Sequence, residues 1–507
     1  MNPETKEKLD YVKSVLKEAT NYAIACNVLA FDQETICPSK GMQAQGEANA
    51  YLANQLFKLI KSDEFIAASE YLYEHIDELD DLDKVLADQY HRDYVKNKNI
   101  TPEKNLEFTL AYNKAFVDWT KARQNSDFSM FADSLKKVRD VSIEKVNLRE
   151  LSPEDKERGI YNQLVGDYER GITTEELDKC FEHCKERLIP LLKKILSSKK
   201  KIRTDFMHRE VKEYQQVEMV KFLLEVLHFD LERGAFSTSE HPFTHWVSQD
   251  DTRITTHYYP TDFSASMYSI IHESGHALFE MLQPSEDYDH YIQDGKTLGM
   301  HESVSRMYEN RIGRSRSFVK LIFPKAKEIF CDILSDVTEE EFYEAINAVS
   351  PSLIRTESDE FTYTFHIIIR YEIEKEIIEG NLDIADIPKR WREKYEEYLG
   401  VSPKTDREGV LQDVHWASGF GYFPTYSMGN MYNAMYYNRM KNEIDIDKCL
   451  ENGDLEAIHN WMKNNVFAKA NRLAPSEWIK DITGRDFTAD DFLDYLEEKY
   501  SKIYELD

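Results

Sequence analysis

Apolar residues recur at helical spacing along most of the chain. After Asn2-Pro3, a cap followed by a proline suited to a first helical turn, Leu9, Val12 and Leu16 mark one apolar face. Further helix starts stand at Thr101-Pro102 and Ser152-Pro153. Residues 29–38 are expected to break the first helix. The pattern predicts a mainly α fold.

One stretch favours a strand instead. Asp251–Tyr259 is rich in β-branched and aromatic residues and ends at Pro260, which predicts a short strand or hairpin. A helix should follow, from near Asp262 or Ser264 to a point before Pro284. Residues 409–430, dense in glycine and aromatic residues, are expected to form a loop. Without an internal repeat or a linker, residues 1–507 are expected to form a single domain.

Composition and charge argue against a protein that binds nucleic acids or membranes. Glycine (18) and proline (14) are sparse for 507 residues, as in helical proteins. The net charge of −29 would repel polyanions, which argues against a nucleic-acid partner. No apolar run is long enough to span a bilayer, and the polar N-terminus lacks a signal core, so we expect no membrane partner and a cytoplasmic location. The six cysteines are scattered; Cys180 and Cys184 with His183 form half a metal site without an evident second pair.

The apolar run 271–280 contains the pattern H-E-x-x-H. Residues four apart share a helix face, so His272 and His276 would present two imidazoles to one point, as a zinc ion requires. Glu273 could then act as a general base on water activated by the metal. The simpler alternative is a buried helix with two incidental histidines.

A catalytic zinc site needs a third protein ligand and an open position. Glu302 is the candidate, since a second helix could return past the first after a turn near Pro284 and Gly295. It could also be an exposed glutamate at a helix start. His301 is the rival ligand, and Glu302 would then face elsewhere.

Peptide hydrolysis also needs hydrogen-bond donors for the carbonyl oxygen. His415, Tyr422 and Tyr426 are candidate donors, although each taken alone is more often a core residue than a catalytic one. Spacing does not decide between the two tyrosines.

Three further residues are candidates for substrate binding. Arg355 offers a planar fork for a carboxylate, unless it forms an internal ion pair with Glu357 or Asp359. His241 and Arg253 are ambiguous when taken singly.

Together these residues resemble the carboxypeptidase Taq family of metallocarboxypeptidases. The family motifs H-P-F, D-x-R-x-T, H-E-x-x-H, H-E-S, I-R-x-x-A-D and G-x-x-Q-D-x-H-W have counterparts here in the same order, with Ser358 in place of the alanine of the fifth. They stand at His241-Pro242-Phe243, Asp251 with Arg253 and Thr255, His272 to His276, His301-Glu302-Ser303, Ile354-Arg355 with Asp359, and Gly409 with Gln412-Asp413 and His415-Trp416.

The resemblance implies a large helical fold with a deep groove and a small sheet at its wall. It implies one zinc ion per chain, replaceable by cobalt, and a homodimer. It implies broad removal of C-terminal residues from peptides with a free C-terminus, with poor action on terminal proline. By this resemblance the metal ligands are His272, His276 and Glu302, and Glu273 is the base.

The resemblance also assigns the substrate contacts. Arg355 would bind the terminal carboxylate, and His415 with Tyr422 or Tyr426 would stabilise the oxyanion. His241 and Arg253 would line the groove or support the site, and Asp359 and Asp413 are candidates for holding the zinc histidines. A helical zinc endo-oligopeptidase and a non-catalytic binding protein with a relic metal site remain alternatives.

Overall fold

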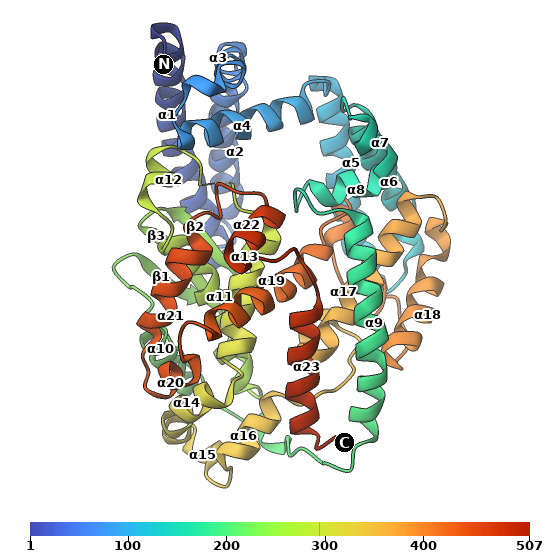
Figure 1. Ribbon diagram of the computed structural model, residues 1–507. Coiled ribbons are helices and arrows are strands. Elements are labelled where there is room, and N and C mark those ends of the chain that lie inside the picture. The colour runs from blue at the N-terminus through green and yellow to red at the C-terminus, as the bar shows by residue number, and fades with distance from the viewer. Residues whose placement is uncertain (294, 507) are drawn as a thin grey trace.

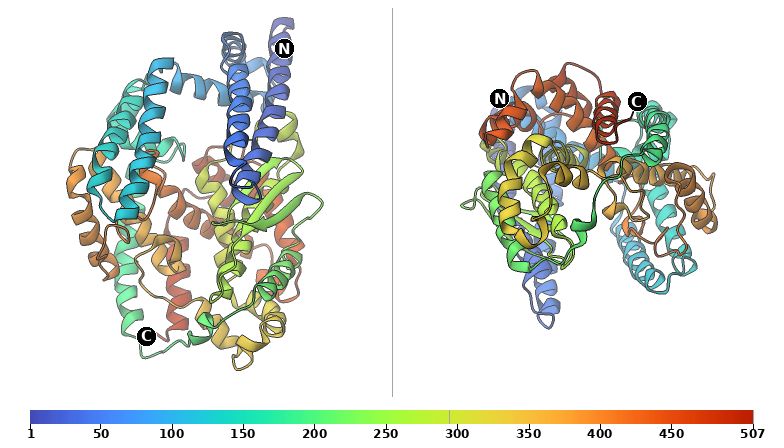
Figure 2. Two further views of the ribbon diagram at one scale, coloured as in Figure 1. Left: turned by 180° about the vertical axis from the view of Figure 1, so that it is seen from behind. Right: turned by 90° about the horizontal axis from the view of Figure 1, so that it is seen from below.

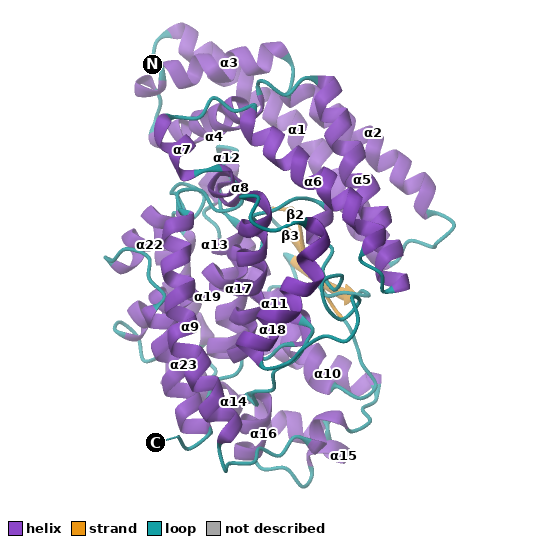
Figure 3. Ribbon diagram, turned by 90° about the vertical axis from the view of Figure 1, so that its right-hand side faces the viewer, coloured by secondary structure: helices purple, strands orange, loops and turns teal. Residues whose placement is uncertain are grey.

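The structure, a computed structural model, describes residues 1–293 and 295–506. It is built mostly of helices around one small sheet, so the prediction of a mainly α fold is confirmed (Figures 1 and 3). Within the described residues, no helix is both long enough and apolar enough to cross a bilayer.

Two groups of helices precede the sheet. The first comprises α1 (Pro3–Thr35), α2 (Met42–Ile60), α3 (Asp63–Glu74) and α4 (Asp81–Asn97). Helix α4 crosses from this group to the second one (Figure 1). The second group comprises α5 (Pro102–Asn125), α6 (Ser129–Asn147), α7 (Pro153–Arg158), α8 (Ile160–Gly166) and α9 (Thr174–Ser197). The first group has a small apolar core of its own, separate from the main core.

The first helix ends within residues 29–38, as expected, but late in that segment. Helix α1 continues to Thr35, because Phe31 is buried and packs edge-on against Phe243, with ring centroids 5.8 Å apart. Proline 38 then keeps the chain from continuing as a helix. The C-terminal end of α1 therefore lies beside the sheet (Figure 2).

The sheet has three strands in the order β1-β3-β2. They are β1 (Gly234–Thr238), β2 (Thr244–Ser248) and β3 (Asp251–Thr256), which confirms the predicted strand before the motif helix. β1 is parallel and β2 antiparallel to β3. Thr256 bonds to Ser269 of the next helix from one face of the sheet, whereas His245 bonds to the Asn27 carbonyl of α1 from the other.

The remaining helices enclose the centre of the molecule. They are α10 (Glu213–Val226), α11 (Phe263–Met281), α12 (Ser285–Asp289), α13 (Leu298–Arg306), α14 (Arg316–Ile329), α15 (Cys331–Leu334), α16 (Glu339–Ile346), α17 (Glu360–Ile378), α18 (Ile387–Leu399), α19 (Pro424–Lys441), α20 (Ile446–Glu451), α21 (Leu455–Met462), α22 (Pro475–Thr483) and α23 (Asp490–Ile503). A π-helical segment, Met307–Ile312, follows α13 directly. The predicted loop 409–430 ends early, because Pro424 occupies the first turn of α19.

Two glycines allow α13 to pack closely between α11 and α19. A Cβ on Gly275 of α11 would lie 2.7 Å from Cα of Ser305, and one on Gly429 of α19 would lie 3.0 Å from Cγ of Glu302. Any larger residue would push these helices apart. The glycines therefore fix the position of Glu302 relative to the H-E-x-x-H helix.

Candidate functional site

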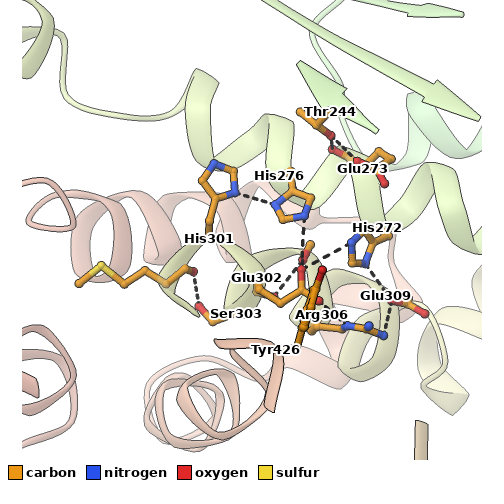
Figure 4. Close-up of polar contacts among 12 residues, drawn as sticks. Thr244, His272, Glu273, His276, His301, Glu302, Ser303, Arg306, Glu309 and Tyr426 are labelled. Carbon is orange, nitrogen blue, oxygen red and sulfur yellow. Dashed lines mark hydrogen bonds and ion pairs between the residues drawn. The ribbon is translucent and has the colours of Figure 1, made fainter. Parts of the chain in front are cut away.

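Helices α11 and α13 bring the three predicted metal ligands together. Nε2 of His272 and Nε2 of His276 lie 3.8 and 3.5 Å from Oε2 of Glu302. One donor atom from each residue falls within 4.8 Å of the others (Figure 4). Two imidazole nitrogens and a carboxylate oxygen around one point are a donor set that suits a divalent metal.

The far nitrogen of each histidine has its own partner. Nδ1 of His272 lies 2.9 Å from Oε2 of Glu309, and Nδ1 of His276 lies 2.6 Å from Nδ1 of His301. With Nδ1 engaged, each Nε2 is directed at the common point. His301, the rival ligand, thus supports His276 from behind (Figure 4).

The suggestion that Asp359 and Asp413 hold the zinc histidines is wrong. Asp359 caps α17 by accepting a hydrogen bond from the Thr362 N–H at 2.9 Å. Asp413 is paired with arginines instead. Asp359 is committed to a helix end, and Glu309 and His301 take the places that it and Asp413 were expected to fill.

A buried polar chain extends beyond His301. Its Nε2 lies 2.7 Å from Oε1 of Glu280, and Nζ of Lys296 lies 3.3 Å from the other oxygen of Glu280. Burial would raise the pKa of the Glu280 carboxyl, but Lys296 and His301 outweigh it and lower the pKa to about 2. Glu280 is therefore a charged acceptor that fixes the orientation of His301.

Arg306 binds Oε1 of Glu302, the carboxylate oxygen that is not the one closest to the histidines. Nε of Arg306 donates to Oε1 of Glu302 at 2.8 Å, and its Nη1 donates to Glu309 at 3.2 Å. The guanidinium also stacks over the ring of Tyr363, 4.1 Å from its centroid. Arg306 thus links a candidate ligand to the residue that holds His272, and it leaves Oε2 of Glu302 facing the histidines.

Glu273 lies beside the histidines and is 7% exposed. The hydroxyl of Thr244, at the start of β2, donates to Oε2 of Glu273 at 2.6 Å (Figure 4). The sheet therefore positions one oxygen of this carboxylate.

Arg355 is buried and paired, though not with Glu357 or Asp359. Nη2 of Arg355 lies 3.0 Å from Oδ1 of Asp413, and Nη1 donates to the hydroxyl of Tyr363 at 3.0 Å. Nη2 of Arg370 lies 2.6 Å from the other oxygen of Asp413. Two guanidinium groups share one carboxylate, so the buried group Arg355–Asp413–Arg370 carries a net positive charge.

His415, Tyr422 and Tyr426 form an aromatic cluster beside Arg355. Nε2 of His415 lies 3.3 Å from the Tyr426 hydroxyl, and the Arg355 guanidinium lies 4.9 Å from the centre of the Tyr426 ring. The rings of His415 and Tyr422 have centroids 5.1 Å apart. Burial lowers the pKa of His415 to about 4, so its ring is neutral near pH 7.

His241 and Arg253 are not brought to this cluster. Arg253 is paired with Asp251 at 2.7 Å, on the sheet face that meets α1, where it lies over Phe31. The side chain of His241 is exposed in the loop between β1 and β2, and its backbone carbonyl accepts from Ser239. They remain candidates for the wider substrate surface only.

Several supporting residues were missed in the sequence. Arg306 and Glu309 follow Glu302 on the same helix face, so helical spacing could have found them. Thr244, Tyr363 and Arg370 gave no such signal, because their contacts join segments distant in the chain.

Comparison with known proteins relates this arrangement to a single family. Residues 11–500 match the family described as carboxypeptidase Taq (M32) metallopeptidase. The chain is 35% identical to "Carboxypeptidase 1" of Bacillus subtilis over 97% of each chain. It is 36% identical to "Thermostable carboxypeptidase 1" of Thermus thermophilus, over 96% of this chain and 97% of that one. An M32 carboxypeptidase structure from Deinococcus radiodurans superposes with a TM-score of 0.94 at 29% identity, over 98% of this chain and 100% of that one.

Proposed function

The chain belongs to the carboxypeptidase Taq (M32) family of metallopeptidases and is a metallocarboxypeptidase that depends on a divalent metal; from this we propose that it is a zinc enzyme that removes single C-terminal residues with Glu273 as general base. The ligands proposed are His272, His276 and Glu302. The comparisons support the class of reaction, and the geometry supports the division of roles among the residues.

The net positive charge of the buried group Arg355–Asp413–Arg370 is the observation that carries the proposal. Arg355 and Arg370 share Asp413, and Tyr363 connects Arg355 to Arg306, the partner of Glu302. A buried net positive charge so close to the candidate metal ligands suits an anionic group of the substrate. A peptide has a main-chain carboxylate only at its C-terminus, so this pairing favours the last peptide bond.

The residues fit a zinc ion, and cobalt should substitute for it. Neutral imidazoles and a carboxylate suit both metals. When bound, the metal would supply Lewis acidity that lowers the pKa of water and polarises the carbonyl oxygen.

The other groups divide the work of proton transfer and orientation. Glu273 takes a proton from the attacking water and gives it to the leaving amine. Thr244 holds one oxygen of that carboxylate, which leaves the other free for the proton. Arg355 orients the terminal carboxylate.

Tyr426 is the tyrosine we propose as the donor to the carbonyl oxygen, with His415. Its hydroxyl lies 3.3 Å from Nε2 of His415, and its ring lies against the Arg355 guanidinium. Tyr422 contacts Tyr426 edge-on, with ring centroids 5.4 Å apart, and packs against Tyr168, which favours a supporting role.

Digestion of one peptide with free and amidated C-termini tests the proposal. The products should form a ladder from the free C-terminus, the amidated peptide should stay intact, and a chelator should stop the reaction until zinc or cobalt is added. Internal fragments would indicate an endo-oligopeptidase instead. A chelator-insensitive protein, or one that hydrolyses neither peptide, would refute the proposal.

Of the remaining expectations, the specificity and the dimer rest on the family resemblance, and the single domain and the cytoplasmic location rest on the sequence. We propose broad side-chain preference, poor release of terminal proline, a single catalytic domain, a homodimer and a cytoplasmic location. Mass analysis of digests of peptides ending in different residues tests the first two, and light scattering tests the dimer.

A further inference from the structure

Helix α17 presents two buried charged side chains, one turn apart, to the segment that carries His415. Arg370 is fully buried, and its Nη2 donates to Oε1 of Gln412 at 2.8 Å. Its Nε donates to Asp413 at 2.7 Å. Arg370 therefore fixes the segment on the N-terminal side of His415.

Glu374 is the second of these residues, and it is 1% exposed. One carboxylate oxygen accepts from Nε1 of Trp416 at 2.7 Å. The other accepts from the backbone N–H of Gly421 at 2.8 Å and from the Tyr161 hydroxyl at 2.9 Å. Among the described residues, no lysine or arginine forms an ion pair with it. Burial raises the pKa of Glu374 to about 7.

Two of these three bonds end next to residues of the aromatic cluster, at His415, a proposed donor, and at Tyr422, which packs against the other proposed donor, Tyr426. Trp416 follows His415 directly, and Gly421 precedes Tyr422. Between them the chain has only the short 3-10 turn His415–Ala417, so no long helix sets its course. Gly421 has φ +93°, and a Cβ there would lie 2.6 Å from the backbone of Leu164 in α8. The path of the segment is therefore set by its side-chain and backbone contacts.

From this arrangement we propose that Glu374 is a positioning residue for catalysis: it holds both ends of residues 415–422 so that His415 and Tyr426 meet the carbonyl oxygen of the substrate. The inference rests on the donor role proposed above for His415. In this role Glu374 acts through its bonds to the segment and not on the substrate directly.

The three partners make the carboxylate hard to replace. All three can donate to it, and the indole and backbone N–H groups can only donate. In Glu374→Gln, the amide nitrogen must face either the Trp416 N–H or the Gly421 N–H. A buried donor then loses its acceptor, which displaces the segment or leaves the donor unsatisfied.

The experiment compares Glu374→Gln, Trp416→Phe and the double variant. The zinc-loaded full chain is used throughout. We expect Glu374→Gln to lower kcat about tenfold or more, with KM and zinc stoichiometry close to wild type. Trp416→Phe alone should lower kcat several-fold. In the double variant the opposing N–H is gone, so kcat should exceed that of Glu374→Gln alone.

This recovery distinguishes positioning from general loss of packing. A second truncation in the core would worsen a merely structural defect, and it cannot restore kcat by that route. Tyr161→Phe is the matched control, because it removes the bond that runs to α8 and leaves both bonds to the segment. Its kcat should stay within about twofold of wild type, because both bonds to the segment remain. If Glu374→Gln does not fold, Trp416→Phe still tests the bond from the other side.

The two proposals can fail separately. Wild-type kcat in His415→Ala would refute the donor role and the inference that rests on it. A large loss in His415→Ala, with wild-type kcat in both Glu374→Gln and Trp416→Phe, would refute only the positioning role of Glu374. Equal losses in Tyr161→Phe and Trp416→Phe, or a double variant worse than Glu374→Gln, would also overturn it.

Discussion

The two halves of the candidate active site are built in different ways. In the metal half, His272, His276 and Glu302 lie on regular helices whose spacing is fixed by close contacts at glycines. In the donor half, His415 lies in an irregular segment held by side chains of α17. The metal half thus depends on helix packing, whereas the donor half depends on a few buried hydrogen bonds. Loss of a single hydrogen bond should therefore reduce activity more in the donor half than in the metal half.

The halves nevertheless have one feature in common, a buried glutamate. Among the described residues, no lysine or arginine lies at hydrogen-bond distance from its side chain. In the metal half it is Glu169, which accepts from Thr297 and from the Gly299 N–H at the start of α13, at 2.7 and 2.8 Å, and from Tyr432 at 3.1 Å. Burial raises the pKa of Glu169 to about 7, as for Glu374. Each carboxylate joins a catalytic segment to a distant part of the chain.

The largest effect on kcat is expected from Glu273→Gln. This variant tests whether proton transfer can be lost in the metal half while metal binding is kept. Loss of the base should lower kcat by about 10²- to 10⁴-fold, because proton transfer loses its acceptor. Zinc content, measured by elemental analysis, should match that of the wild type. Glu328→Gln, at an exposed position of α14, is the control. Substantial turnover in Glu273→Gln would refute the assignment of the base.

Arg355→Ala tests whether the donor half determines action at chain ends. Loss of a desolvated charged contact should cost about 2–5 kcal/mol in kcat/KM on peptides with a free C-terminus. Zinc content should stay normal, since Arg355 contacts no candidate ligand. Arg392→Ala, at a half-exposed position on α18, is the matched control. Unchanged rates in Arg355→Ala would exclude the carboxylate-binding role.

His301→Leu tests whether the metal half depends on a hydrogen bond in addition to helix packing. It removes the partner of His276 Nδ1 without touching a ligand, so zinc affinity should fall about 10- to 100-fold. Competition with a coloured chelator measures this change directly, and kcat at saturating zinc should fall much less. His208→Ala, an exposed histidine in a 3-10 turn, is the control. Equal zinc affinity in His301→Leu and wild type would show that helix packing alone orients His276.

The same contrast explains how far the sequence could predict the site. His272, Glu273 and His276 follow from helical periodicity, and Glu302 from the need for a third ligand. Glu309 lies on the same helix face and was within reach of such reasoning. Glu374 was not, because its role depends on Trp416 and Gly421, which only the tertiary fold brings next to it. Motif residues reveal the chemistry, but the buried partners that come from distant segments of the chain leave no periodic signal.

The smallest effect on turnover is expected from Glu169→Gln, whose signature is the pH dependence of stability. The folded pKa of about 7 lies above the ordinary value of 4.5, so folding favours the protonated carboxyl. Its contribution is fully present below about pH 4.5 and is lost as the pH rises through about 7. Glutamine cannot titrate. The difference in unfolding free energy, wild type minus Glu169→Gln, should therefore fall between about pH 4.5 and 7, by no more than about 3 kcal/mol, and stay constant above.

Urea unfolding in the presence of a chelator, repeated at each pH, measures this difference in unfolding free energy. For the control Glu328→Gln the difference should not change with pH. A difference that rises with pH would mean that folding favours the ionised form of Glu169. The analogy between Glu169 and Glu374 would then fail.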